Sequence, residues 1–331
     1  TMMWDYWSLN PESLHQVMIL FSDRGTPDGY RFMNGYGSHT FSMFNKKNES
    51  VWVKFHFKTQ QGNKTLTGPQ ADELRGKDPD YSQRDLVEAI SRKDFPKWTL
   101  KIQVMTEAQA KKFRWNPFDL TKVWPHKEFP LIEAGVMELN EIPSNYFAEV
   151  EQAAFAPSNT IPGIGLSPDK MLQGRILAYP DAHRYRLGAN YEQLPVNRPI
   201  VPVHNHQRDG FMALNGNGGS APNYFPNSFD DIEAGKEYKE PPMSIESDVA
   251  DTWDRNQNDN DHYSQAGALF RKVMTDQERA NTVANFVGAL KGVSGPKKKE
   301  ILLRQLDHFN KADKELAVLV AKGLGIKYPA K

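Results

Sequence analysis

Residues Ser167–Gly188 read SPDKMLQGRILAYPDAHRYRLG, and this stretch carries more reactive side chains for its length than any other part of the 331-residue chain. Ser167, Pro168 and Asp169 are typical of a helix start, because a serine caps free amides, a proline fits the first turn, and an acid suits the positive end of a helix. We therefore predict a helix here, and we expect Pro180 to kink or loosen one of its turns.

Four side chains of this predicted helix share one face. Arg175 and Tyr179 are four residues apart, and His183 and Arg186 continue the face at helical spacing. A fixed positive charge beside a phenol favours the phenolate, which is a hard anionic ligand suited to ferric iron. Arg–Tyr pairs at this spacing are more often surface pairs than metal sites, so the spacing alone leaves both interpretations open.

The overall composition excludes several classes of function. Lys+Arg and Asp+Glu both total 41, so no charge excess indicates a nucleic acid, an anionic membrane or an acidic substrate. The chain contains no cysteine, which excludes disulfides and thiolate metal sites. No apolar run is long enough to span a bilayer, and the first residues do not resemble a signal peptide. The balanced charge therefore favours a neutral partner or substrate.

The region before residue 140 alternates strand and helix patterns. From Val51 to Lys58 apolar and polar residues alternate strictly, which predicts a strand with one buried face. Two more strands are predicted at Thr99–Thr106 and Leu131–Leu139, and short helices at Asp72–Lys77 and Arg84–Lys93 lie between the strands. The predicted fold class is therefore α+β, an antiparallel sheet with helical insertions.

The pattern changes after residue 145. A short helix is predicted at Tyr146–Phe155, and a long tract rich in Pro, Asn and Gly follows the helix that contains Tyr179. Aromatic residues in that tract favour a wrapping segment over disorder. From Tyr263 the pattern is helical, with a Thr275 cap and two apolar stripes: Val283, Phe286, Val287 and Leu290, then Leu302, Leu306 and Phe309. We therefore divide the chain into residues 1–145, 146–243 and 244–331.

The string GRILAYPDAHRYRLGANYEQLPVNRP, residues 174–199, resembles the proximal haem segment of the haem catalases. Neighbouring segments resemble the same family in order along nearly the whole chain. The resemblance implies a haem b cofactor with Tyr179 as the axial ligand of the iron, as is usual in catalases, and Arg175 as the group that keeps the phenol ionised. It also implies that Arg186, with His183, contacts the haem, Arg186 by pairing with a propionate.

A second matching string, NGYGSHTF at residues 34–41, contains His39. A single histidine in a strand is more often a hydrogen-bonded core residue than a functional one. The resemblance implies a role on the proximal side, where His39 would link Asp169 to Arg175. Such a chain of contacts would hold the arginine in place and tune the phenolate.

The resemblance to small-subunit catalases also implies an NADPH site. Cationic side chains suit its phosphates, an indole suits stacking on a ring, and histidines and amides suit the sugars. No GxGxxG turn is present, so a Rossmann site is excluded. Without the resemblance these residues would be interpreted as scattered surface polar groups. The matching positions are His15, Ser22, Arg24, Asn34, Tyr36, Lys58, Trp124, His126, Lys127 and Gln265.

The family's fold is an eight-stranded antiparallel β-barrel, of which this chain resembles the later strands only. The distal histidine and asparagine of the family match no position in the 331 residues. An open half-barrel exposes unpaired backbone and an apolar face, so we expect it to need its other half, the amino-terminal segment of a catalase. We expect the isolated chain to be nearly inactive.

The function that the resemblance implies is catalase activity, the disproportionation of hydrogen peroxide to water and dioxygen. Two alternatives stay open: a non-catalytic haem- or NADPH-binding subunit, and a catalase-related haem enzyme that processes another peroxygen compound. The family also implies an interlocked homotetramer, with no nucleic acid or membrane as partner. The last residues, YPAK, differ from the peroxisomal SKL signal, so a cytoplasmic location is expected.

Overall fold

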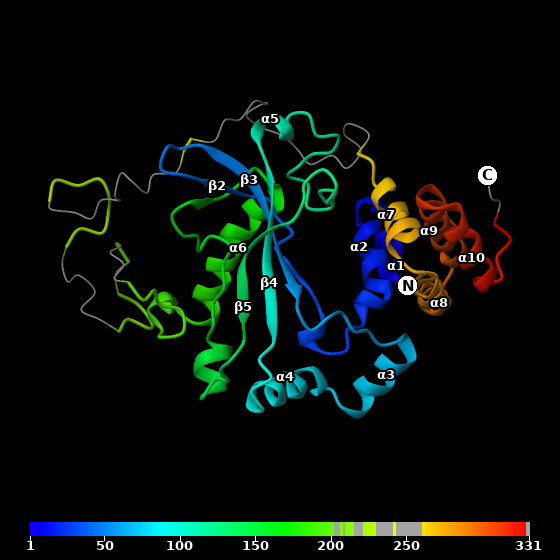
Figure 1. Cartoon of the computed structure of the whole chain (residues 1–331), viewed down its shortest axis with the longest axis horizontal. Helices are drawn as coiled ribbons and strands as arrows, with labels where there is room; N and C mark the ends of the chain where they lie inside the picture. The colour runs from blue at the N-terminus through cyan, green and yellow to red at the C-terminus, as the bar shows by residue number, and fades with distance from the viewer. Residues whose placement is uncertain (202–205, 208, 215–220, 230–240, 243–259, 329–331) are drawn as a thin grey trace.

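A computed structural model describes residues 1–201, 206–207, 209–214, 221–229, 241–242 and 260–328. Figure 1 shows a twisted sheet in the middle of the molecule and a cluster of helices to its right, in which the amino-terminal helices lie beside helices from the carboxyl-terminal part of the chain. Helix α6 is drawn to the left of strands β4 and β5, away from that cluster. The chain is therefore α+β, as predicted.

The sheet is antiparallel at each of its pairings in the described part of the chain. Its strand order is β5-β4-β3-β2-β6, and β1 also pairs with β3. The strands are β1 (Gly35–Tyr36), β2 (Phe41–Phe44), β3 (Ser50–Thr59), β4 (Lys97–Met105), β5 (Ile132–Glu138) and β6 (Ile164–Gly165). In the described residues β5 borders only β4, and Ile132 and Val136 on it are 50% and 56% exposed.

The three predicted strands are confirmed as β3, β4 and β5, each with ends that shift by one or two residues. The predicted short helices are also found, as α3 (Gly68–Lys77) and α4 (Tyr81–Ser91). Helix α3 begins four residues early, because Thr67 and Gln70 form a capping box. A short α5 (Glu107–Ala110) follows β4.

Strand β3 is covered on both faces, whereas the alternation predicted one solvated face. Val53 is fully buried on one face, and Lys54 is only 6% exposed on the other. The cover over Lys54 is the segment 117–129, because Lys54 Nζ donates to the carbonyl of Lys122 and Gln103 Nε2 donates to the carbonyl of Trp124. A polar strand face can be buried when another segment satisfies its donors.

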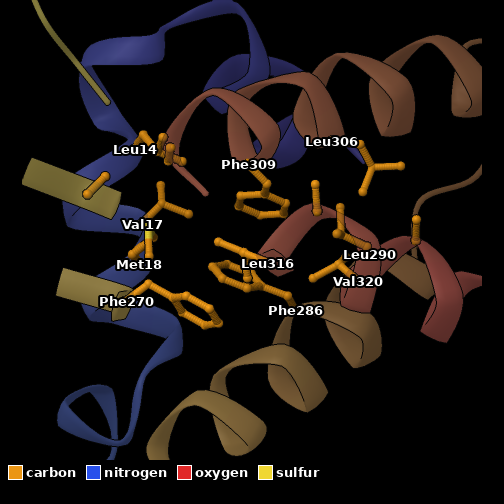
Figure 2. Packing of buried hydrophobic residues seen from close by; sticks show 14 of the residues in the cluster. Leu14, Val17, Met18, Phe270, Phe286, Leu290, Leu306, Phe309, Leu316 and Val320 are labelled. Atoms are coloured by element: carbon orange, nitrogen blue, oxygen red, sulfur yellow. The ribbon is translucent and has the colours of Figure 1, made fainter. Parts of the chain in front are cut away.

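The helical cluster has a continuous aromatic and aliphatic core, part of which is drawn in Figure 2. Phe270, Phe286 and Phe309 are fully buried in it, and both predicted apolar stripes face it. The predicted Thr275 cap is confirmed, since its side chain and that of Glu278 form a capping box. The cluster contains α1 (Met2–Leu9), α2 (Leu14–Phe21), α7 (Ser264–Ala268), α8 (Asp276–Lys291), α9 (Lys298–Ala312) and α10 (Lys314–Leu324).

Helices α1 and α2 pack in the same core as the carboxyl-terminal helices. Leu14, Val17 and Met18 lie beside Phe270 and Phe286 (Figure 2). The division into residues 1–145, 146–243 and 244–331 stays a prediction, and the structure adds that the first of these segments contributes to the helical cluster as well as to the sheet.

Helix α6 (Lys170–Arg186) begins three residues after the predicted serine cap. Asp169 is the N-cap, and its Oδ1 accepts hydrogen bonds from the amides of Met171 and Leu172. Ser167 instead donates to the carbonyl of Thr40 and so ties the helix start to the sheet. Pro180 lies inside the helix, which continues through it to Arg186.

The neighbouring predictions are met only in part. The helix predicted at Tyr146–Phe155 is a single π-helical turn at Phe147–Glu151. Part of the tract predicted to wrap around a partner, namely residues 202–205, 208, 215–220 and 230–240, lies outside the described residues. Among the helices that the structure does describe, none is both long and apolar enough to cross a membrane.

Candidate functional site

The side chains of Arg175 and Tyr179 meet on one face of α6. Arg175 Nη2 lies 2.8 Å from the phenol oxygen of Tyr179, and the guanidinium carbon lies 4.8 Å from the centre of the phenol ring. A guanidinium has only donors, so the phenol oxygen accepts this bond. A charge-assisted bond of this kind stabilises negative charge on the phenol oxygen.

The other end of Arg175 contacts His39. Nη1 of Arg175 lies 2.8 Å from Nε2 of His39, and Nδ1 of His39 lies 2.8 Å from Oδ2 of Asp169. Because the guanidinium can only donate, Nε2 accepts, and the imidazole proton is on Nδ1 and is donated to the carboxylate. Arg175 therefore donates both to the phenol oxygen of Tyr179 and to His39, and His39 in turn donates to Asp169, so the four side chains form one continuous chain of hydrogen bonds.

Local backbone structure places His39 at this point. The residue lies in the bend between β1 and β2, where Ser38 adopts a left-handed φ of 61° and the amide of His39 donates to the carbonyl of Gly37 at 2.7 Å. Strand β6 pairs with β2 through Ser42 and Gly165, which brings the start of α6 beside the bend. Two residues 130 positions apart in sequence thus form one buried pair, with His39 3% and Asp169 1% exposed.

His183 and Arg186 lie further along α6 and bind the chain itself. Arg186 donates to the carbonyls of Glu151 and Ala153 at 2.6 Å and 2.8 Å. His183 donates from Nε2 to the carbonyl of Phe155 at 2.8 Å and accepts from Arg186 at Nδ1. Both side chains therefore hold the segment 151–155 against α6, and their contacts with a haem stay predictions.

Some of the residues predicted to bind NADPH come together on β1, β3 and the segment after Trp124. Lys58 Nζ donates to the hydroxyl of Tyr36 at 3.1 Å, and Asn34 donates to the same hydroxyl at 3.3 Å. Burial and, to a smaller extent, the charge of Lys58 lower the pKa of His126. Lys127, which follows His126 in the sequence, is exposed.

A second group lies at α2 and the turn that follows it. Ser22 accepts from the amide of Arg24. Burial and the charges of Lys122 and Arg24 lower the pKa of His15 to about 4. Gln265 connects the helical cluster to the same region, because its side-chain amide both donates to and accepts from the main chain of Val123.

Trp124 differs from the expectation that it stacks on a ring of the dinucleotide. Its side chain is 2% exposed, the ring packs 5.6 Å from that of Phe129, and Lys54 Nζ lies 5.3 Å from its centre. An indole that is covered in this way offers no free face for stacking. Its membership of the NADPH set stays a prediction.

The sequence interpretation missed two polar residues between these groups. His56 lies on β3 with its ring 5.8 Å from that of Tyr36 and 6.0 Å from that of His126, and its Nε2 lies 2.9 Å from Oε1 of Gln103. Gln103 is 1% exposed and also donates to the carbonyls of Trp124 and Phe129. The alternation of β3 and β4 places both residues on the polar face, but it does not reveal that this face is covered.

The family model described as "Catalase" matches residues 1–231, and a second model, "Catalase-related immune-responsive", matches residues 256–324. The chain belongs to the catalase family. It is 57% identical over 326 residues to the catalase of the Onchocerca volvulus endobacterium and to catalase A of Pseudomonas putida, in each case over 98% of this chain.

The likeness to solved catalases extends to the fold. Catalase A from Saccharomyces cerevisiae superposes with a TM-score of 0.90 at 41% identity, over 98% of this chain and 67% of that one. The predicted catalase-like fold is confirmed: a curled antiparallel half-barrel with carboxyl-terminal helices. The chain spans 66% of the length of the two curated catalases that it matches.

Proposed function

We propose that this chain belongs to a working catalase and supplies the proximal side of its haem site. The reaction converts two molecules of hydrogen peroxide to two of water and one of dioxygen. One observation carries the proposal: the continuous chain of contacts Asp169–His39–Arg175–Tyr179, which ends on a phenol oxygen that accepts a charge-assisted hydrogen bond. Membership of the catalase family supports the same activity.

The residues present fit a haem iron. A phenol oxygen held beside a guanidinium is suited to binding ferric iron as the phenolate. When bound, the haem supplies the redox chemistry by which one peroxide is reduced and a second is oxidised. Tyr179 would hold the iron, and Arg186 and His183 would contact the rest of the haem, with Arg186 pairing with a propionate.

The side chains behind Tyr179 keep its oxygen available as a ligand. Arg175 donates an N–H to that oxygen and places a positive charge beside it. His39 fixes the rotation of Arg175 by accepting its second N–H. Asp169 fixes His39 and is itself held by two amides at the start of α6. The resulting site is pre-organised, so little rearrangement is needed when the haem binds.

We extend the proposal to the accessory cofactor and the assembly. NADPH would bind where Lys58, Arg24 and Lys127 provide positive charge, beside the connected side chains of Asn34 and Tyr36. The active form would be a homotetramer in the cytoplasm. The chain would contribute the later strands of the barrel, and the remaining portion of a catalase would contribute the distal acid–base residues.

Oxygen release tests this proposal. The 331-residue chain is loaded with haem, its mass is verified, and oxygen is measured with an electrode after peroxide is added. We expect little oxygen from the chain alone, and rapid release once it is mixed or co-expressed with the remaining portion of a full-length catalase. A mixture that binds haem and stays inactive would contradict the catalase assignment. Rapid release by the verified chain alone would show that one of its own residues does the work of a distal acid–base group.

A further inference from the structure

A turn at residues 124–129 carries three of the residues predicted to bind NADPH. The ends of the turn are buried, with Trp124 2% and Phe129 6% exposed. His126 and Lys127, which lie between these ends, are exposed. The direction in which the two exposed side chains point therefore depends on what holds the two buried ends.

Both ends are held by the side chain of Gln103 on β4, which is 1% exposed. Its Nε2 donates to the carbonyl of Trp124 at 3.0 Å and to that of Phe129 at 2.6 Å. A glutamine amide has two N–H donors, so these two hydrogen bonds use both of them. A single buried amide group therefore ties the first residue of the turn to the last.

The carbonyl oxygen of the same amide connects the turn to His56 on β3. Oε1 of Gln103 lies 2.9 Å from Nε2 of His56, and because Oε1 can only accept, His56 donates this bond. The ring of His56 lies 6.0 Å from that of His126 at an interplanar angle of 85°, which is an edge-to-face arrangement. Gln103 is thus connected to His126 twice, through the backbone of the turn and through a neighbouring ring.

We propose that Gln103 is a positioning residue of the NADPH site: its buried amide closes the turn 124–129 and so directs His126 and Lys127 towards the dinucleotide. Because Gln103 is 1% exposed, it acts through the residues of the turn and not by touching the ligand. The inference rests on the proposed function, since it states how two members of the proposed NADPH site are held in place.

A simpler role for Gln103 is to stabilise the fold alone. Removing its amide leaves two buried carbonyls without their donor, which lowers stability whatever the chain binds. Gln305→Met is the matched control, because Gln305 is a second buried glutamine, 2% exposed, and lies on α9 in the helical cluster. Gln103→Met and Gln305→Met should both affect stability, but only Gln103→Met should affect the turn and the binding of NADPH.

The first readout needs no NADPH. The amides of Glu128 and Phe129 donate to the carbonyl of Pro125 at 3.0 Å and 2.9 Å, so their hydrogen exchange reports whether the turn is closed. Exchange is measured by mass spectrometry on peptides of the full 331-residue chain that span the turn. It should be about tenfold faster in Gln103→Met than in the parent, because the hydrogen bonds that close the turn are lost, and unchanged in Gln305→Met.

The second readout is the dissociation constant of NADPH, measured by fluorescence titration in a double-mutant cycle with Lys127→Ala. Gln103→Met alone should weaken binding about tenfold, and Gln305→Met should leave it unchanged. Lys127→Ala should weaken binding about tenfold in the parent, because it removes a charge-assisted contact, but hardly at all in Gln103→Met, where the turn no longer directs Lys127.

Gln103→Asn is the second variant, since it keeps an amide that is one methylene group too short to reach both carbonyls. It should behave as Gln103→Met does, and it decides alone if Gln103→Met does not fold. Unchanged exchange in the turn, parental NADPH affinity in the Gln103 variants, or an equal cost of Lys127→Ala in both backgrounds would each overturn the proposal. A parent chain that binds no NADPH would instead overturn the proposed NADPH site, and this inference with it.

Discussion

Nη2 of Arg175 lies 2.8 Å from the phenol oxygen of Tyr179, one turn further along α6. The spacing of four residues makes the contact possible, but it does not set the direction of the guanidinium. The direction comes from His39, which accepts the N–H of the other terminal nitrogen of Arg175. A residue from the bend between β1 and β2 therefore helps to decide how two residues of a helix meet.

Tyr179→Phe is expected to abolish iron ligation, because phenylalanine has no oxygen to offer. The measurement is a haem titration of the purified chain followed in the Soret and visible region. Tyr185→Phe is the matched control, since Tyr185 lies on the same helix and is 96% exposed. An unchanged spectrum in Tyr179→Phe would contradict the assignment of Tyr179 as the iron ligand.

Arg175→Ala is expected to have a milder effect. The phenol oxygen remains, but the cation that favours its deprotonated form is gone, so haem binding should persist at high pH and the iron–phenolate spectrum should fade as the pH is lowered. The measurement is the visible spectrum of the haem-loaded chain across a pH series. Arg184→Ala, an exposed arginine on the same helix, is the control. If the phenolate spectrum of Arg175→Ala survives at every pH where the parent's does, Arg175 has no such role.

Arg24→Ala combined with Lys127→Ala is expected to weaken NADPH binding by about 2–3 kcal/mol in total, because each change removes a charge-assisted contact with a phosphate. Binding is measured by fluorescence titration. Arg75→Ala with Lys77→Ala removes the same total charge from α3, where the side chains are 80% and 73% exposed, and should leave binding unchanged. Normal NADPH affinity in the first pair would show that these positions are wrongly assigned.

Much of the fold could be predicted from periodicity. The strict alternation from Val51 to Lys58 gave β3, and the apolar stripes around Phe286 and Phe309 gave α8 and α9. Strands β1 and β6 are two residues long and could not be found in this way, because a pattern of period two needs several repeats. Their existence depends on pairing with distant segments.

The covered face of the sheet could not be predicted either. Lys54 and Gln103 look like solvated positions in an alternating strand, and they are buried only because the segment 117–129 folds back over them.

In the candidate site, the pair Arg175 and Tyr179 could be predicted from helical spacing. The contact of His39 with Asp169 followed from the resemblance to a family, since 130 residues separate the two.

We expect the stability of the chain to depend on pH through the protonation of His56. Burial lowers its pKa to about 4, and only the hydrogen bond to Gln103 opposes the shift. Its Nδ1 is buried and has no hydrogen-bond partner in the described part of the chain, so protonation would bury an unsatisfied N–H. Because the folded pKa lies below the unfolded value, the contribution of His56 is fully present above about pH 6.5 and is lost as the pH falls towards 4.

His56→Gln is therefore expected to make the chain less sensitive to acid, since glutamine can still donate to Gln103 but does not titrate. Between pH 7 and pH 5 the free energy of unfolding of the variant should fall by about 1 kcal/mol less than that of the parent, a figure reduced to allow for solvent screening of this part-exposed residue. The measurement is urea unfolding of both chains at the two pH values. Lys112→Gln, which removes one exposed charge elsewhere, should keep the parent's pH dependence. If His56→Gln loses as much stability as the parent, then His56 is protonated in the folded chain without cost, and the buried Nδ1 must gain a partner at low pH.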